Sequence, residues 1–341
     1  MLRRVAIVLL IFVICGAAGA FWIGRRLATP YRGFTDPAVY LELPPGTSER
    51  EIARRLADAG VVPDELTFRV AVRLGHAGRR LQAGEYRFEV AATPGEIVAR
   101  LARGDVDTQM VTFPEGLTIR EMASIFERTG LGTANDFAQA AAAGALAASF
   151  DAKAKTLEGY LFPSTYALHR RAGADGAVAM MVAQFQRVFD PSLQAIAAEQ
   201  HVSIRKVITL ASIIEKETAQ PNERPLVSAV IQNRLKIGMP LQCDPTVIYA
   251  LMLANRWDGN ITKQDLQIDS PYNTYRYPGL PPGPIASPGR SSIVAALHPA
   301  DVSYLYFVSR NDGTHVFAST LDEHNRNVAQ WQSHLRPLKQ H

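Results

Sequence analysis

A predicted helix carries two glutamates near its end. Residues 206–218 have apolar side chains at helical spacing, which predicts an amphipathic helix. Its apolar stripe consists of Val207, Leu210, Ile213 and Ile214. Glu217 continues that stripe, whereas Glu215 points toward the other face. A carboxyl on an apolar face loses hydration, which raises its pKa toward the range where it can donate a proton. Glu217 is therefore the candidate general acid.

A structural interpretation of these carboxyls stays open beside the catalytic one. Glu217 could emerge from the core at the helix end and pair with Lys216 or Arg234. Glu158, followed by Tyr160 in an aromatic segment, could orient a substrate or accept hydrogen bonds from neighbouring backbone amides. The residues alone do not separate these roles.

Aromatic and amide side chains gather around the loops that follow this helix. Such side chains recognise sugars by stacking on ring faces and by hydrogen bonding to hydroxyl groups, although tyrosines are also ordinary core and loop residues. The candidates are Asn233, Gln242, Tyr249, Tyr272, Asn273 and Tyr275. Long loops rich in Pro and Gly more often carry a binding surface than serve as plain connections. A carbohydrate ligand is the expectation.

The elements that must hold these residues are helices and a hairpin. The sequence predicts helices near residues 176–189, 203–218 and 224–237. Residues 302–308 and 314–317 read as strands joined by a turn at 311–313. The predicted fold class is α+β.

Two segments in the first third of the chain repeat one pattern. Residues 43–53 and 113–123 each read as a strand end, a Pro/Gly turn and a helix start. Ser48 and Thr118 are the predicted N-caps, with Glu51 and Glu121 at the capping-box position. A small module built from such units suits carbohydrate binding or spacing, although the repeat could also be only ordinary turn and cap chemistry.

The amino terminus reads as a membrane anchor. Twenty residues, 5–24, carry no charge, and at about 1.5 Å per residue they can cross a bilayer core of about 30 Å. Arginines flank the run on both sides, and the α-amino group favours an amino terminus on the cytoplasmic side. Ala18-Gly19-Ala20 resembles a signal-peptidase site, but the apolar run continues past it, so an uncleaved anchor is expected.

Composition excludes several function classes. The chain has 341 residues with a formal net charge of +4. It lacks the stripe of basic residues that is typical of nucleic-acid-binding proteins, so nucleic acid is not an expected partner. Cys15 and Cys243 are the only cysteines, so no disulfide framework or cysteine metal site is expected. We predict no metal and no cofactor.

Six blocks of sequence resemble one family in the same order. They are residues 157–166, 211–218, 233–242, 244–249, 272–275 and 279–285, and they closely resemble the YceG-like family over nearly the whole chain. Cys243 departs from the small polar residue expected between Gln242 and Asp244. The resemblance implies an anchor at residues 1–26, a linker at 27–40, a LysM-like module at 41–108 and a catalytic domain at 109–337.

The resemblance also implies the activity and where it occurs. Members of the family are lytic transglycosylases, which cleave the β-1,4 bond between N-acetylmuramic acid and N-acetylglucosamine without water and leave 1,6-anhydro ends. Such an enzyme would terminate strand elongation at the periplasmic face of the inner membrane, with peptidoglycan synthases as partners. The family's catalytic acid falls on Glu217. The predicted substrate-binding residues are Glu158, Asn233, Gln242, Asp244, Tyr249, Asn273 and Tyr275.

Two alternatives remain from the sequence. A membrane-anchored scaffold could bind peptidoglycan strands without cleaving them. A hydrolytic muramidase would use water rather than the C6 hydroxyl as the attacking group, and the sequence does not reveal the distance from Glu217 to a second carboxyl.

Overall fold

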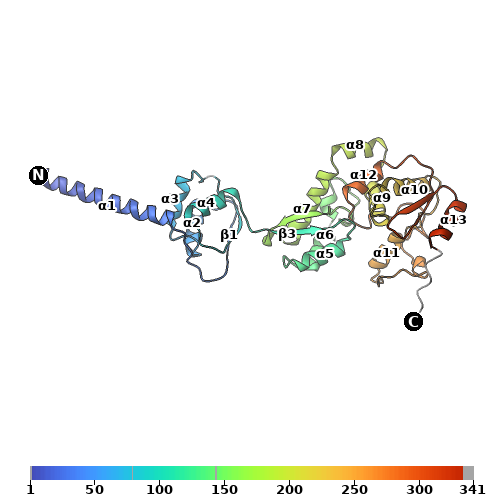
Figure 1. The fold of residues 1–341 in the computed structure, drawn as a ribbon, viewed down its shortest axis with the longest axis horizontal. Coiled ribbons are helices and arrows are strands. Elements are labelled where there is room, and N and C mark those ends of the chain that lie inside the picture. Colours follow the sequence, from blue (N-terminus) through green and yellow to red (C-terminus); the bar gives the residue numbers. More distant parts are fainter. Residues whose placement is uncertain (1, 79, 143, 333–341) are drawn as a thin grey trace. The chain divides into compact units, whose positions relative to one another are not determined.

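The computed structural model describes residues 2–78, 80–142 and 144–332, which form two compact units. The first unit contains residues 1–109 and a short excursion at 169–171, and the second contains the remainder. The first unit begins with helix α1 (Leu2–Ala28), drawn in dark blue in Figure 1. Within α1, Leu9–Ala28 is long and apolar enough to cross a membrane, somewhat later than the run predicted from the sequence.

The first unit continues as a small module of strands and helices. Its elements are β1 (Val39–Leu43), α2 (Glu49–Asp58), α3 (Glu65–Leu74), β2 (Gly84–Phe88) and α4 (Pro94–Arg103). β1 and β2 pair antiparallel with Leu41 opposite Tyr86, and the helices close over them. The side chains of Leu43, Leu56, Phe68 and Leu101 are almost fully buried in a core of this unit's own. Burial of this apolar surface is the main stabilising contribution to so small a module.

The two predicted helix caps differ in the structure. Thr118 and Glu121 form the complete capping box, because each side chain binds the other residue's backbone N–H. Ser48 accepts from the N–H of Glu51, but the carboxylate of Glu51 binds Arg54 and Arg55 instead of returning to the cap. The second half of the predicted box at Ser48 is therefore wrong, since two nearby guanidinium groups compete for that carboxylate.

The second unit contains most of the helices. In chain order they are α5 (Ile119–Arg128), α6 (Ala134–Ala142), α7 (Gly173–Val188), α8 (Pro191–Glu199), α9 (Ile204–Glu217), α10 (Arg224–Lys236), α11 (Asp244–Leu253), α12 (Arg290–Leu297) and α13 (Leu321–Gln332). Short 3-10 helices lie at Gly144–Ala147, Arg170–Ala172 and Asp265–Gln267, of which Arg170 and Arg171 fall in the first unit. The strands are β3 (Gln109–Phe113), β4 (Ser164–Leu168), β5 (Tyr306–Ser309) and β6 (His315–Ala318), and they pair as β3–β4 and β5–β6. This mixture of helices and short strands is consistent with the predicted α+β class.

Helix α9 is the central element of the second unit. It packs against α10, α11 and α12, which surround it in Figure 1. All eight residues from Val207 to Ile214 are buried, so the helix is covered on nearly every side rather than along one stripe. An apolar helix buried all round is held in place by the whole domain core. A residue at its end is therefore fixed in position.

The carboxy-terminal hairpin is shorter than predicted. β5 and β6 pair antiparallel with Phe307 opposite Phe317, and the turn at 311–313 joins them as expected. Residues 302–305 lie outside the strand, because their carbonyl groups bind elsewhere: those of Val302 and Tyr304 accept from Asn233. The predicted domain end at residue 337 falls outside the described residues.

Candidate active site

Glu217 is the last residue of α9. The helix begins after Ser203, whose side chain caps the backbone of Lys206, and it ends because Thr218 adopts an extended conformation. The Thr218 hydroxyl donates to Glu223, and the same carboxylate binds the backbone and ring of His315 on β6. These buried bonds fix the residue that follows Glu217, so the carboxyl leaves the helix in a defined direction.

The Glu217 carboxyl is partly buried and carries no ion pair within the described part of the chain. Burial, with a smaller contribution from the nearby charge of Asp244, raises its pKa to about 7 against the opposing effects of the Cys243 thiol and Arg234. An acid with this pKa is divided between its two protonation states near neutral pH. It can therefore both donate and accept a proton there.

The structural alternative for Glu217 required a pair with Lys216 or Arg234. Lys216 donates instead to the carbonyl of Gly116, at 3.1 Å. Arg234 donates to the carbonyls of Leu305 and Leu241, both at 2.6 Å. Both cationic side chains therefore bind backbone carbonyls instead of the Glu217 carboxyl, which is left free to exchange a proton with a substrate.

Glu215 differs from the expectation that it points away from the core. Its side chain is 6% exposed and binds Arg224 at 2.9 Å, and it also accepts from the N–H of Gly289. The reason is that α9 is buried on both faces, so Glu215 meets Arg224 on the next helix and Gly289 from 74 residues further along the chain. A paired carboxylate of this kind is a structural element, which leaves Glu217 as the unpaired acid of the helix.

Three predicted substrate-binding residues lie beside Glu217 or next to its neighbours. Tyr275 donates its hydroxyl to Asp244 at 2.6 Å; burial and this bond raise the pKa of the tyrosine, and the charge of Glu217 adds to the shift. Gln242 is exposed, at a backbone φ of 54°, and its side chain makes no hydrogen bond to the described residues. Together they form a polar rim around the acid.

Two predicted amide residues are engaged with the protein itself. Asn273 is fully buried; its nitrogen binds the carbonyls of Leu266 and Ile268 and its oxygen accepts from the N–H of Tyr275. Asn233 is bound to the carbonyls of Val302 and Tyr304. This geometry suits positioning of loops, and direct contact with a ligand stays a prediction for both residues.

Glu158 and Tyr249 form a second site. The carboxyl of Glu158 accepts from the N–H of Ile119, the first residue of α5, at 3.1 Å, and from the hydroxyl of Tyr249 at 3.2 Å. Burial raises its pKa to about 8, because these hydrogen bonds only partly offset the loss of hydration. Both residues line a cavity of about 550 Å³ between α5, α6 and α11. The structure therefore brings this pair together in a cavity that neither Asp244 nor Tyr275 lines.

Sequence reasoning missed the role of Cys243. It was expected to be structurally incidental, yet the buried thiol, which donates to the carbonyl of Leu241 at 3.7 Å, also lies against the Glu217 carboxyl, and burial together with that charge raises the pKa of the thiol well above its usual range. Its position directly before Asp244 was the available signal. No local pattern indicated the bond between Glu223 and His315, because 92 positions separate these two residues in the chain.

Replacing Cys243 tests this contact. Cys243→Ala removes a donor that lowers the pKa of Glu217, so we expect that pKa to rise and the alkaline limb of the pH–activity profile to move upward. Cys243→Ser supplies a stronger donor and should move the limb downward. The profiles of both variants are measured beside the wild type, and identical profiles would contradict the contact.

Comparison with known proteins places this geometry in a family. The family model described as the YceG-like family matches residues 41–330. A Bacillus subtilis (strain 168) protein named endolytic murein transglycosylase is 34% identical over 324 residues, which cover 90% of this chain and 89% of the relative. A protein of the same name from Streptococcus pneumoniae serotype 2 (strain D39 / NCTC 7466) is 28% identical over 86% of this chain and 58% of its own length.

A solved structure agrees with these matches. The crystal structure of a YceG-like protein from Listeria monocytogenes has a TM-score of 0.57 and 31% sequence identity, and the match covers 86% of this chain and 99% of that one. The likeness therefore extends over most of both chains.

Proposed function

The chain belongs to the YceG-like family, and from that premise we propose that Glu217 serves as both acid and base in the cleavage of peptidoglycan strands. The enzyme is a lytic transglycosylase acting on peptidoglycan, the activity for which its curated relatives are named. The bond cleaved is the β-1,4 link between N-acetylmuramic acid and N-acetylglucosamine. The observation that carries the proposal is an unpaired, half-buried carboxyl with a pKa of about 7 at the fixed end of a buried helix.

One carboxyl is sufficient for both proton transfers. Protonated Glu217 gives its proton to the glycosidic oxygen as the bond from C1 to that oxygen breaks. The resulting carboxylate then takes the proton of the C6 hydroxyl as its oxygen attacks C1, which closes the 1,6-anhydro ring and restores the acid. The 2-acetamido group of the sugar can stabilise the cationic centre, so a second carboxylate is not required.

The rim residues support binding of the sugar next to this acid. Tyr275 and Asp244 hold each other by a hydrogen bond of 2.6 Å, and Gln242 has a free amide in the described structure. An aromatic ring and free hydrogen-bonding groups beside an acid are the groups that a sugar ring needs. Tyr275 and Gln242 are assigned to contact with the substrate, and Asn273 to holding Tyr275 in place.

The cavity of Glu158 supports a more distant contact with the same strand. Its carboxyl is protonated at neutral pH when its pKa is about 8, so it can donate to a carbonyl oxygen such as that of an acetamido group. Tyr249 holds the carboxyl from the other side. This role is positioning of the strand, because Glu217 already performs both proton transfers.

The pH dependence of cleavage tests the role of Glu217. The free enzyme must carry the proton before it binds substrate, and the pKa of Glu217 is raised to about 7. We therefore expect kcat/KM to be level on the acid side of about pH 7 and to fall about tenfold per unit on the alkaline side. A profile with its alkaline limb near pH 4 to 5 would contradict the assignment, since the acid would then have an ordinary carboxyl pKa.

The amino-terminal helix and the first unit support a cellular location and a glycan-binding role for the enzyme. The apolar helix Leu9–Ala28 serves as a single-pass anchor in the inner membrane, with the enzyme domain in the periplasm. The β1–α2–α3–β2 unit has its own core and serves as a LysM-like module that binds glycan. Cleavage within nascent strands would terminate their elongation, in association with peptidoglycan synthases.

A further inference from the structure

A cavity lies at the end of α9 opposite to Glu217. Its volume is about 870 Å³, and it is formed by residues 150–153, most of residues 200–210, the loop 279–282 and parts of α10 and α12. At 1.5 Å per residue, the fourteen residues of α9 separate its two ends by about 20 Å. The cavity is therefore distinct from the site of proton transfer.

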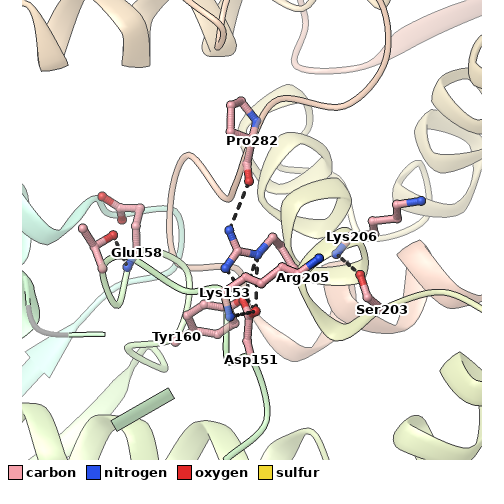
Figure 2. A network of polar contacts seen from close by, with 9 residues as sticks. Asp151, Lys153, Glu158, Tyr160, Ser203, Arg205, Lys206 and Pro282 are labelled. Carbon is pink, nitrogen blue, oxygen red and sulfur yellow. Dashed lines mark hydrogen bonds and ion pairs between the residues drawn. The ribbon is translucent and has the colours of Figure 1, made fainter. Parts of the chain in front are cut away.

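One wall of this cavity is a closed ion pair. Arg205 binds the buried carboxylate of Asp151 through two nitrogens, each at 3.0 Å, and reaches the carbonyl of Pro282 at 3.4 Å (Figure 2). Asp151 also accepts from the hydroxyl of Tyr160 and the N–H of Lys153. Burial alone would raise the pKa of Asp151, but the bonds from Arg205 and Tyr160 outweigh it and lower the pKa. The negative charge of Asp151 is therefore compensated by Arg205 and is not available to the neighbouring lysines.

Two lysines at the cavity lack such a partner. In Figure 2 no dashed line reaches the amino group of Lys153 or Lys206, and neither forms an ion pair with a residue that the structure describes. The four charged lining residues are Asp151, Lys153, Arg205 and Lys206, so two positive charges remain. Lys206 lies in the first turn of α9, where the helix dipole is also positive, and Lys153 lies in the loop 150–153 that lines the same cavity. A bound anion would neutralise these two lysine charges and stabilise the lining of the cavity.

The interior of the cavity adds apolar surface and one unsatisfied hydroxyl. Four leucines line the cavity, namely Leu210, Leu235, Leu280 and Leu297. Thr209 lines the cavity as well, is 1% exposed, and its Oγ1 has no hydrogen-bond partner in the described structure. A buried hydroxyl without a partner is costly, which points to a ligand that supplies the missing bond.

We propose that this cavity binds the peptide stem of the substrate strand, with Lys153 and Lys206 on its carboxylates and the leucines around its small apolar side chains. The proposal rests on the proposed function, because peptidoglycan carries short peptides with free carboxylates and alanine methyl groups. Five extended residues span up to about 17 Å, a few ångströms less than the length of α9. A stem therefore reaches the cavity when its sugar lies on the side of Glu217 that faces the cavity.

Comparison of two substrates tests this inference. The full chain in detergent is given uncrosslinked strands that carry peptide stems, and the same strands after an amidase has removed the stems. For Lys153→Gln/Lys206→Gln we expect KM for stem-bearing strands to rise about tenfold, with stripped strands cleaved as by the wild type. Lys263→Gln, an exposed lysine that does not line the cavity, is the matched control and should change neither.

The buried hydroxyl supplies a second variant that does not depend on charge. Thr209→Val removes an unsatisfied polar group, so the melting temperature should hold or rise while KM for stem-bearing strands rises severalfold. A rise in KM of equal size on both substrates, or none on either, would overturn the inference.

Direct binding separates this inference from the catalytic proposal. The probe is a free stem pentapeptide, titrated into the full chain, beside the same peptide with its carboxylates amidated. We expect binding of the free acid alone, retained in Glu217→Gln and lost in the double lysine variant. Binding that persists after amidation, or no binding to the wild type, would overturn the stem site while leaving the role of Glu217 untouched.

Discussion

Glu217→Gln is expected to lower kcat by at least about 10²- to 10⁴-fold, the contribution typical of general acid–base catalysis. The amide has nearly the shape of the carboxyl, but it can neither give the proton to the glycosidic oxygen nor take one from the C6 hydroxyl. Because one group performs both transfers, both halves of the reaction are lost. Cleavage of purified strands by the full chain, measured as released fragments, gives the rate.

The same variant should fold normally. Glu217 has no ion pair among the described residues, so the substitution breaks no buried pair. We expect an unchanged or slightly raised melting temperature and retained binding to strands. Glu199→Gln, at an exposed position at the end of α8, is the matched control and should keep full activity. Near-normal activity of Glu217→Gln would refute the assignment and direct attention to Glu158.

Arg224→Gln is expected to have the largest effect on stability. Arg224 and Glu215 are 8% and 6% exposed, and their nitrogen and oxygen lie 2.9 Å apart. Removal of the cation leaves the carboxylate buried with only the N–H of Gly289 for compensation. Breaking a buried pair in this way costs about 3–5 kcal/mol of the free energy of unfolding. Chemical denaturation of the purified chain measures this loss.

An exposed pair provides the matched comparison. Arg256 lies 3.6 Å from Asp265 with its side chain 54% exposed, so Arg256→Gln should cost about 1 kcal/mol or less. The double variant Arg224→Gln/Glu215→Gln should recover part of the loss, since no unpaired charge remains buried. Equal, small losses for the two arginine variants would show that the pair at Glu215 is not a structural element.

The parts of the fold that depend on neighbouring residues were predictable. α9 spans Ile204–Glu217, within one residue of the predicted helix at each end, because an apolar run at helical spacing is a local feature. The hairpin turn at 311–313 follows from the same kind of local chemistry. The pattern also indicated Glu217, rather than Glu215, as the better proton donor, and that role stays a prediction.

The surroundings of the acid were not predictable, because they come from distant parts of the chain. Glu215 was expected on an outer face, but Arg224 and Gly289 enclose it. Glu158 meets Tyr249 across 91 residues of sequence. Helical spacing states which residues share a face, whereas the partners that cover that face depend on tertiary packing.

The most direct test of the account is mass spectrometry of the ends produced when the full chain in detergent digests glycan strands, with Glu217→Gln beside it. The account predicts 1,6-anhydro-muramoyl ends from the wild type and none from the variant. Reducing ends would mean that water attacks instead of the C6 hydroxyl, and the enzyme would then be a hydrolase. Anhydro ends from both proteins would contradict the central role of Glu217.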